Sequence, residues 1–273
     1  MKLKKTITKA LNTCRKLFDD AKKLVFPTGG IGRFRFDPKK PHTYHFNKKG
    51  NTKLGGRIFS FSTLMADYTY KGMRGVLKNI TGTCKNCAAC ATSCYVRSSY
   101  RYPNVIFAQA VNTWGMRNEI DKVENDLAAE LAQYKPEIVR LNQSGELEDE
   151  EQMAMWCRLA KAFPDVKFYI YTKMFSIAEK FLLGGLVPEN FTVNYSVWHE
   201  VGVKEYEKVK HLPNVKAFVY DDGKDFILKT KYYCPAYKIP AGKTRAVLNH
   251  DFTCETCRLC ITGKVKVIAC HDH

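Results

Sequence analysis

The feature that most constrains the fold of this 273-residue chain is a regular alternation of strand-like and helix-like segments in its second half. Short apolar runs that are rich in β-branched and aromatic residues lie at 137–144, 166–172, 191–197 and 215–221. Segments with the period of an α-helix lie between them, at 148–163, 175–183 and 203–210. Strands that alternate with helices form parallel sheets through right-handed crossovers, and four such units are too few to close an eight-stranded barrel. The pattern therefore predicts an α/β fold, either a partial (β/α) barrel or an open parallel sheet.

The segments before this alternation have a different character. Residues 1–26 place apolar side chains three or four apart among lysines, which predicts a basic amphipathic helix. Residues 26–80 are rich in Gly, Pro, Asn and Lys, which is typical of short strands and loops. A polar helix is expected over 116–134. We therefore expect two parts, the N-terminal helix at 1–26 and a single α/β domain over 27–273.

Two cysteine-rich loops, at 81–98 and 232–273, lie at the two ends of the α/β section. The first loop reads "TGTCKNCAACATSCYVRS", with the spacing C-x2-C-x2-C-x3-C, and the second contains "TCETCRLC". Cys157 lies on the apolar face of a predicted helix, so we expect it in the core. The remaining candidates are Cys84, Cys87, Cys90 and Cys94 in the first loop, and Cys234, Cys254, Cys257, Cys260 and Cys270 in the second.

The number and spacing of these cysteines indicate a metal site. An odd count of eleven argues against a fully paired disulfide framework, and thiols in a reducing compartment are more often metal ligands. Two-residue gaps let successive sulfurs reach the corners of one cubane, whereas structural zinc usually takes two cysteine pairs separated by a longer stretch. We expect one or two 4Fe-4S clusters, with zinc as the alternative. Spacing alone does not choose the eighth ligand between Cys234 and Cys270.

The charge and the hydropathy of the chain limit which kinds of partner it can have. The formal net charge of +17 would attract nucleic acid or another polyanion. The sequence has no run of eighteen apolar residues, so no membrane span is expected. Its N-terminus lacks the apolar segment and the cleavage site of a secretory signal. None of these features indicates an oligomeric state.

Several short motifs in a fixed order resemble a cysteine-rich phage family, called after gene product eighty-eight of a mycobacteriophage. They are "TC" at 83–84, "CATSCY" at 90–95, "RLNQSGEL" at 140–147, "YIYTK" at 169–173, "CPA" at 234–236 and "TCETCRLC" at 253–260. The resemblance implies a viral protein that acts in the cytoplasm of the infected host cell. The residues that it favours as ligands are Cys84, Cys90, Cys94, Cys234, Cys254, Cys257 and Cys260, while Cys87 and Cys270 are less typical.

The order of elements also resembles the radical S-adenosylmethionine enzymes. In those enzymes a cysteine loop is followed by a helix and then by a strand that ends in a Gly-Glu motif, which meets the methionine amine. Here "NQSGEL" makes Ser144, Gly145 and Glu146 candidates for binding S-adenosylmethionine. The family's C-x3-C-x2-C motif is not matched, because Arg97 stands at the third cysteine position.

Three residues are candidates for catalysis. Lys173 and His199 follow predicted strands, and parallel sheets bind ligands at the carboxyl ends of their strands. Glu146 is the third candidate. Each also has an ordinary structural interpretation: Glu146 in the acidic first turn of a helix, Lys173 as a solvated lysine, and His199 as a loop histidine.

Two hypotheses of function follow. The first is a viral iron–sulfur protein that performs redox or radical chemistry and needs an electron donor. The second is a nucleic-acid-binding protein whose fold is held by a structural zinc ion or cluster.

Overall fold

The computed structural model describes residues 31–49, 51–86, 90, 94–198, 200–221, 228–243, 246–263 and 265–271. The predicted helix at 1–26 lies outside these residues. The chain divides into two compact units that interleave along the sequence. Unit 1 comprises Met1–Thr43, Ser62–Glu119 and Ser144–Glu146, and unit 2 comprises Tyr44–Phe61, Ile120–Gln143 and Leu147–His273. The expectation of one domain over 27–273 stays a prediction.

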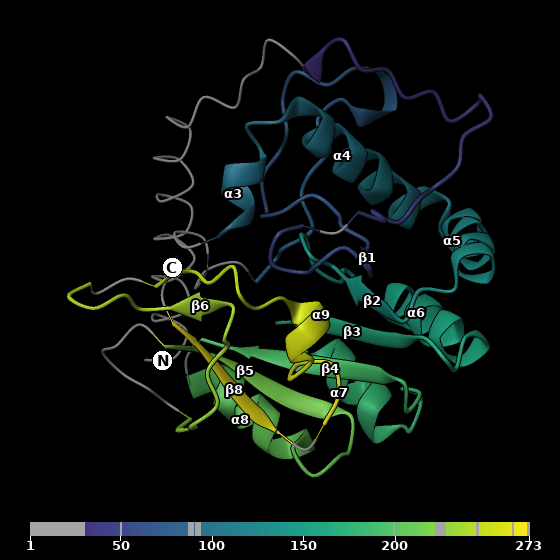
Figure 1. Ribbon diagram of the computed structural model, residues 1–273. Helices are drawn as coiled ribbons and strands as arrows, with labels where there is room; N and C mark the ends of the chain where they lie inside the picture. Colours follow the sequence, from purple (N-terminus) through teal and green to yellow (C-terminus); the bar gives the residue numbers. More distant parts are fainter. Residues whose placement is uncertain are drawn as a thin grey trace, which may run out of the picture. The chain divides into compact units, whose positions relative to one another are not determined.

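Unit 2 is built on a six-stranded sheet in which every neighbouring pair of strands is parallel (Figure 1). In sheet order the strands are β1 (Ile58–Ser60), β2 (Ile138–Leu141), β3 (Lys167–Thr172), β4 (Phe191–Val197), β5 (Val215–Asp221) and β8 (Val267–His271). The four strands that the sequence predicts are β2 to β5, and β1 and β8 extend the sheet at its two edges. The prediction of an α/β fold is confirmed. Of the two predicted forms, the structure has the open parallel sheet, which is not closed into a barrel.

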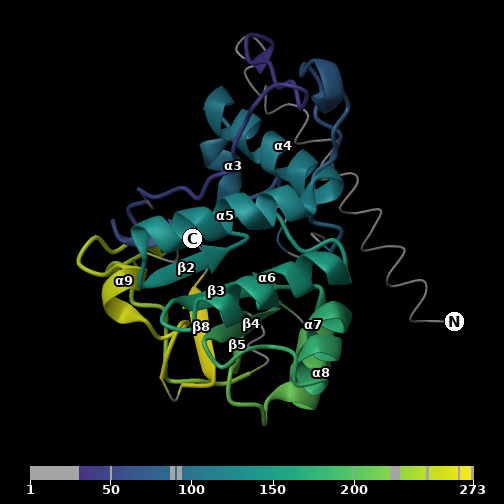
Figure 2. The same ribbon diagram turned by 90° about the vertical axis from the view of Figure 1, so that its right-hand side faces the viewer.

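Helices provide the crossovers between the strands of unit 2. They are α5 (Ile120–Tyr134), α6 (Glu150–Ala162), α7 (Phe175–Leu183) and α8 (Glu200–Val209). These helices lie along one face of the sheet, while the short helix α9 (Cys254–Cys257) lies on the opposite side (Figure 2). A two-stranded antiparallel ribbon of β6 (Tyr237–Lys238) and β7 (Val247–Leu248) precedes α9. Because both faces of the sheet are covered, the central strands β2 and β4 are buried almost throughout.

The predicted helix over 116–134 is two helices. The first, α4 (Pro103–Asn118), ends where Glu119 leaves the helical conformation with φ −140° and ψ 43°. The second, α5, then begins at Ile120. The sequence contains no proline or glycine at this break, so local signals did not reveal it.

Unit 1 packs around α4. The described part of this unit also contains a short 3-10 helix, η1 (Gly75–Leu77), and the one-turn helix α3 (Val96–Ser99). Pro103 begins α4, a position where the missing N–H removes no helical hydrogen bond. The buried side chains of this unit include Leu64, Met65, Tyr70, Leu77, Tyr100, Ile106 and Ala110.

A buried lysine fastens the C-terminal segment of unit 2 to the sheet. Lys216 lies on β5 with 3% of its surface exposed. Its Nζ donates to the carbonyl oxygens of Thr262, Gly263 and Val265 at 3.2, 3.0 and 2.7 Å. An ammonium group is buried at low cost only when its donors are satisfied, and here three backbone carbonyls accept them. The segment that leads into β8 is thereby held at one register.

We expect Lys216→Met to lower the free energy of unfolding by about 3 kcal/mol, because it leaves three carbonyl groups without their donor. Lys210→Met is the matched control: Lys210 is exposed and paired with Glu207, so its loss should change stability by less than about 0.5 kcal/mol. Urea unfolding of both variants measures the difference. Equal stability of the two variants would contradict this role of Lys216.

Candidate metal centre

The motif "TCETCRLC" folds as one capped helical turn. The hydroxyl of Thr253 accepts from the backbone N–H of Thr256 at 3.3 Å, and the hydroxyl of Thr256 accepts from the N–H of Thr253 at 3.2 Å. This capping box starts α9, which carries Cys254 and Cys257. Arg258 ends the turn with φ 56°, and this left-handed residue redirects the chain. The reversal brings Cys260 back beside the other two cysteines.

Hydrogen bonds from two sides hold this cysteine turn in place. On β4, Asn194 donates to the carbonyl oxygen of Cys260 at 3.0 Å, and the hydroxyl of Thr192 donates to that of Ile261 at 2.8 Å. On the other side, the N–H of Cys254 donates to the carbonyl oxygen of Lys53 at 2.8 Å. Asn194 is buried, so the position of Cys260 is set by the interior of the sheet.

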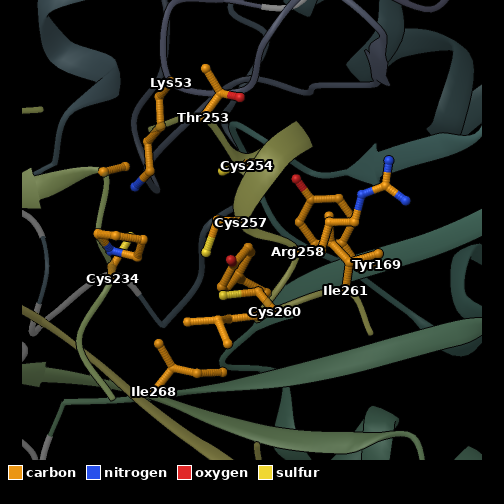
Figure 3. A pocket seen from close by; sticks show the side chains of 14 residues that line it. Lys53, Tyr169, Cys234, Thr253, Cys254, Cys257, Arg258, Cys260, Ile261 and Ile268 are labelled. Atoms are coloured by element: carbon orange, nitrogen blue, oxygen red, sulfur yellow. The ribbon is translucent and has the colours of Figure 1, made fainter. Parts of the chain in front are cut away.

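A fourth cysteine comes from a different part of unit 2. The backbone N–H of Cys234 donates to the carbonyl oxygen of Ala269 on β8, at 2.7 Å. Cys234 then faces the α9 turn across a pocket (Figure 3). Besides four cysteines, Cys234, Cys254, Cys257 and Cys260, the lining includes Lys53, Tyr169, Tyr171, Arg258, Ile261 and Ile268. The structure thus brings these four sequence candidates to one site.

Cys270 lies behind Cys234. Its side chain is buried and packs with Cys234 and Ala236, and it does not line the pocket. The Cys270 thiol is hydrogen-bonded to the sulfur of Cys234 and also lies 3.6 Å from the carbonyl oxygen of His271. The hydrogen bond from Cys270, followed by the charge of Lys53, lowers the pKa of Cys234 although burial opposes ionisation.

Two cations lie beside these thiols. Burial by itself lowers the pKa of Lys53, but the negative charges of Cys234, Tyr237, Cys270 and Cys254 together outweigh burial and raise it. The Nζ of Lys53 also lies 4.2 Å from the ring centre of Tyr237. Arg140 is buried on β2, with its guanidinium 4.9 Å from the ring centre of Tyr171. Both cations lower the pKa of Cys254, although burial dominates and raises it. Lys53 and Arg140 therefore place positive charge next to the positions where thiolates would be buried.

Sequence reasoning did not identify Lys53, Arg140 or Tyr171 at this site. Burial raises the pKa of Cys260 to about 12, and the hydroxyl of Tyr171 opposes the shift by a hydrogen bond to the Cys260 sulfur. Lys53 is one of many lysines in its segment, and Arg140 lies within a strand, so no local pattern marks either one. Their role follows from the strands and loops that meet at the pocket.

The geometry of the thiols determines what the pocket can hold. Among the residues with described positions, no group of three or more His, Cys, Asp or Glu side chains has the arrangement of a metal-ion site. The four cysteines line the walls of one pocket. All four are free thiols, and the three on the α9 turn have raised pKa values, mainly because of burial. Metal binding would therefore release protons.

The first cysteine group lies in unit 1. Cys84 and Cys94 pack against the core, and the Cys94 thiol lies 3.8 Å from the sulfur of Met65. Burial, followed by the charges of Glu146, Cys90 and Cys94, raises the pKa of Cys84 well above its usual range. These groups are therefore electrostatic neighbours. Cys87 lies outside the described residues.

The predicted ligand-binding turn, Ser144 to Glu146, lies next to this first group. The N–H of Glu146 donates to the hydroxyl of Thr83, the residue before Cys84, at 2.8 Å. Ser144 donates to Gln109 at 3.1 Å, and both Ser144 and Glu146 are buried. Helix α6 begins at Glu150, so the interpretation of Glu146 as part of its first turn is wrong.

The other catalytic candidates lie elsewhere. Lys173 follows β3, and its ammonium is 5.1 Å from the ring centre of Trp198. Trp198 in turn stacks on Tyr220 with the ring centres 3.9 Å apart. Lys173 is thus at the carboxyl end of the sheet, as expected, in an aromatic environment. His199 lies outside the described residues.

Comparison with known proteins identifies the family. The family model described as Gene product 88 matches residues 45–263. The chain belongs to the Gene product 88 family. The match includes the four pocket cysteines and ends before Cys270, and it confirms the resemblance of the phage motifs. Searches of curated proteins and of solved structures find no match, and the resemblance to radical S-adenosylmethionine enzymes stays a hypothesis. No helix in the described parts of the chain is long and apolar enough to cross a membrane.

Gly145 offers a test of the packing at the first cysteine group. It has φ +82°, and an added Cβ would lie 1.9 Å from the Thr63 hydroxyl and 2.7 Å from that of Thr83. Gly72 is the control in the same unit, with φ +88° and open space around it. We expect Gly72→Ala to lower the free energy of unfolding by about 1 kcal/mol and Gly145→Ala by about 3 kcal/mol. Thermal or urea unfolding compares them, and equal losses would show that the turn is not tightly packed.

Proposed function

We propose that this protein is an iron–sulfur protein whose unit 2 binds a 4Fe-4S cluster through Cys234, Cys254, Cys257 and Cys260. One observation supports the proposal: these four thiols line a single pocket together with Lys53. A cubane held by four thiolates is an anion, and iron–sulfur sites are tuned by nearby charge and by hydrogen bonds to sulfur. The chain supplies both at this pocket.

The residues around the pocket have separate roles in this proposal. Asn194 and Thr192 hold the backbone that follows the α9 turn on the sheet, so that this segment is anchored before metal binds. Lys53 and Arg140 offset the charge of the bound thiolates. Tyr171 donates to the Cys260 sulfur. When bound, the cluster would supply one-electron transfer, which requires an external electron donor.

Zinc is the alternative occupant of the same four thiols. A four-cysteine set suits structural zinc, and the chemistry of the donors does not exclude it. The spacing of Cys254, Cys257 and Cys260, with two two-residue gaps in succession, favours the cubane. In either case the metal would link the α9 turn to the segment before β6.

A second candidate function rests on unit 1. Buried Glu146 lies in the electrostatic environment of Cys84, Cys90 and Cys94, beside a Gly-Glu turn. This arrangement supports a second cluster with S-adenosylmethionine as its ligand, bound by Ser144, Gly145 and Glu146. Formation of 5′-deoxyadenosine on anaerobic reduction with S-adenosylmethionine would support it, and its absence in iron-loaded protein would refute it. The phage resemblance supports action in the cytoplasm of the infected host cell.

Metal analysis tests the main proposal. Anaerobically purified protein should contain iron and sulfide in equal amounts, about four of each per cluster. Cys257→Ser should lose about four iron atoms per chain and the matching part of the visible absorption. Cys157→Ser is the control, since Cys157 is buried in α6 and is no part of the pocket, and it should retain both. Zinc without sulfide would refute the cluster.

The choice between Cys234 and Cys270 is tested separately. Cys234→Ala should lose metal from unit 2, because Cys234 lines the pocket. Cys270→Ala should retain the iron but shift the reduction potential of the cluster, because a hydrogen bond to a ligand sulfur is removed. Iron analysis and a redox titration distinguish the two. Retention of iron in Cys234→Ala together with loss in Cys270→Ala would assign the ligand to Cys270.

A further inference from the structure

Among the described residues, the excess of basic over acidic side chains is larger in unit 1 than in unit 2. In unit 1 lysines and arginines outnumber acidic residues by more than two to one. Of its few acidic side chains, Glu146 is buried and Glu119 pairs with His42 at 3.0 Å. The basic side chains therefore dominate its surface, and such a surface attracts polyanions.

The segment that follows the first cysteine loop displays this charge together with aromatic rings. It reads "YVRSSYRY" over 95–102 and includes α3 (Figure 1). Two of its residues are anchors: Val96 is buried, and the hydroxyl of buried Tyr100 accepts from the N–H of Met65 at 3.0 Å and donates to Gln109 at 2.6 Å. The anchors fix which side of the segment faces outward.

Exposed tyrosines lie at both ends of this anchored segment. Tyr95 is 44% exposed and Tyr102 is 49% exposed, although large aromatic side chains are usually buried. Arg101 is exposed, and its guanidinium lies 4.9 Å from the ring centre of Tyr102. Arg97, on α3, lies between Tyr95 and Tyr102 in the sequence and is partly exposed. Two tyrosines and two arginines are thus fully or partly exposed along one anchored segment.

We propose that the surface formed by Tyr95, Arg97, Arg101 and Tyr102 binds single-stranded nucleic acid. Proteins that bind single strands without reading sequence combine basic side chains for phosphates with aromatic rings on which bases stack. The bases of a duplex already stack on one another, so exposed tyrosine rings select an unpaired strand. Phosphates and base faces are common to DNA and RNA, so both kinds of strand bind. This inference goes beyond the proposed cluster, because the surface uses no cysteine.

The test measures binding of fluorescently labelled oligothymidylate to the full chain by anisotropy, at low salt and over a salt series. Oligouridylate should bind with comparable affinity and a duplex of the same length more weakly. Tyr102→Ala should weaken binding of the single strand about tenfold, whereas Tyr102→Phe should retain it. Arg101→Ala should weaken binding and reduce the slope of log affinity against log salt by about 0.7.

Two controls separate this surface from general charge and aromaticity. Tyr134 in unit 2 is 47% exposed and has the ammonium of Lys48 at 4.4 Å from its ring centre, so Tyr134→Ala removes an equivalent ring elsewhere. Lys210→Ala removes an exposed charge of unit 2. Both should leave affinity unchanged. Equal binding of duplex and single strand, or equal affinity of Tyr102→Ala and the unaltered protein, would overturn the proposal. Metal content, measured on the same samples, reports independently on the cluster.

Discussion

Buried polar side chains on the central strands hold the C-terminal segment against the sheet, and the candidate metal centre depends on these contacts. Asn194 on β4 and Lys216 on β5 donate to backbone carbonyls of Cys260 and of the residues that follow it. Such donors are expensive to bury unless every one is satisfied, so the arrangement tolerates few alternatives. The backbone of this C-terminal segment, which has little regular structure, is thereby held in a fixed position by the interior of the sheet.

The electrostatics of the pocket follow from the same burial. Thiols removed from water resist ionisation, as the raised pKa values of Cys257 and Cys260 show. The positive charge of Lys53 has the opposite effect at Cys234, because it lowers the pKa of that thiol. A site that must carry several thiolates needs such compensation, whether the occupant is a cluster or zinc. The combination of close cysteines and buried cations is what distinguishes this pocket from a cysteine-rich core.

The two units differ in what they offer chemically. Unit 2 presents four thiols in one pocket, supported by a parallel sheet. Unit 1 places its cysteines beside a tightly packed Gly-Glu turn, and after them a segment that exposes two tyrosines and two arginines. The family match spans parts of both units. These properties are independent, so each can be tested without assuming the others.

The sequence by itself determined the α/β class, the parallel strands β2 to β5, and the helices between them, because hydrophobic periodicity is a local property of the chain. It also identified Cys254, Cys257 and Cys260 as neighbours, because their spacing carries chemical meaning, but spacing left Cys234 and Cys270 as alternatives. Only the tertiary structure placed Cys234 at the pocket wall and Cys270 behind it, and brought Lys53 and Arg140 to the thiols. These positions depend on which distant segments of the chain come into contact at the sheet, and no local sequence pattern specifies those contacts. The close packing of Gly145 against Thr63 was decided in the same way, by a contact between residues far apart in the sequence.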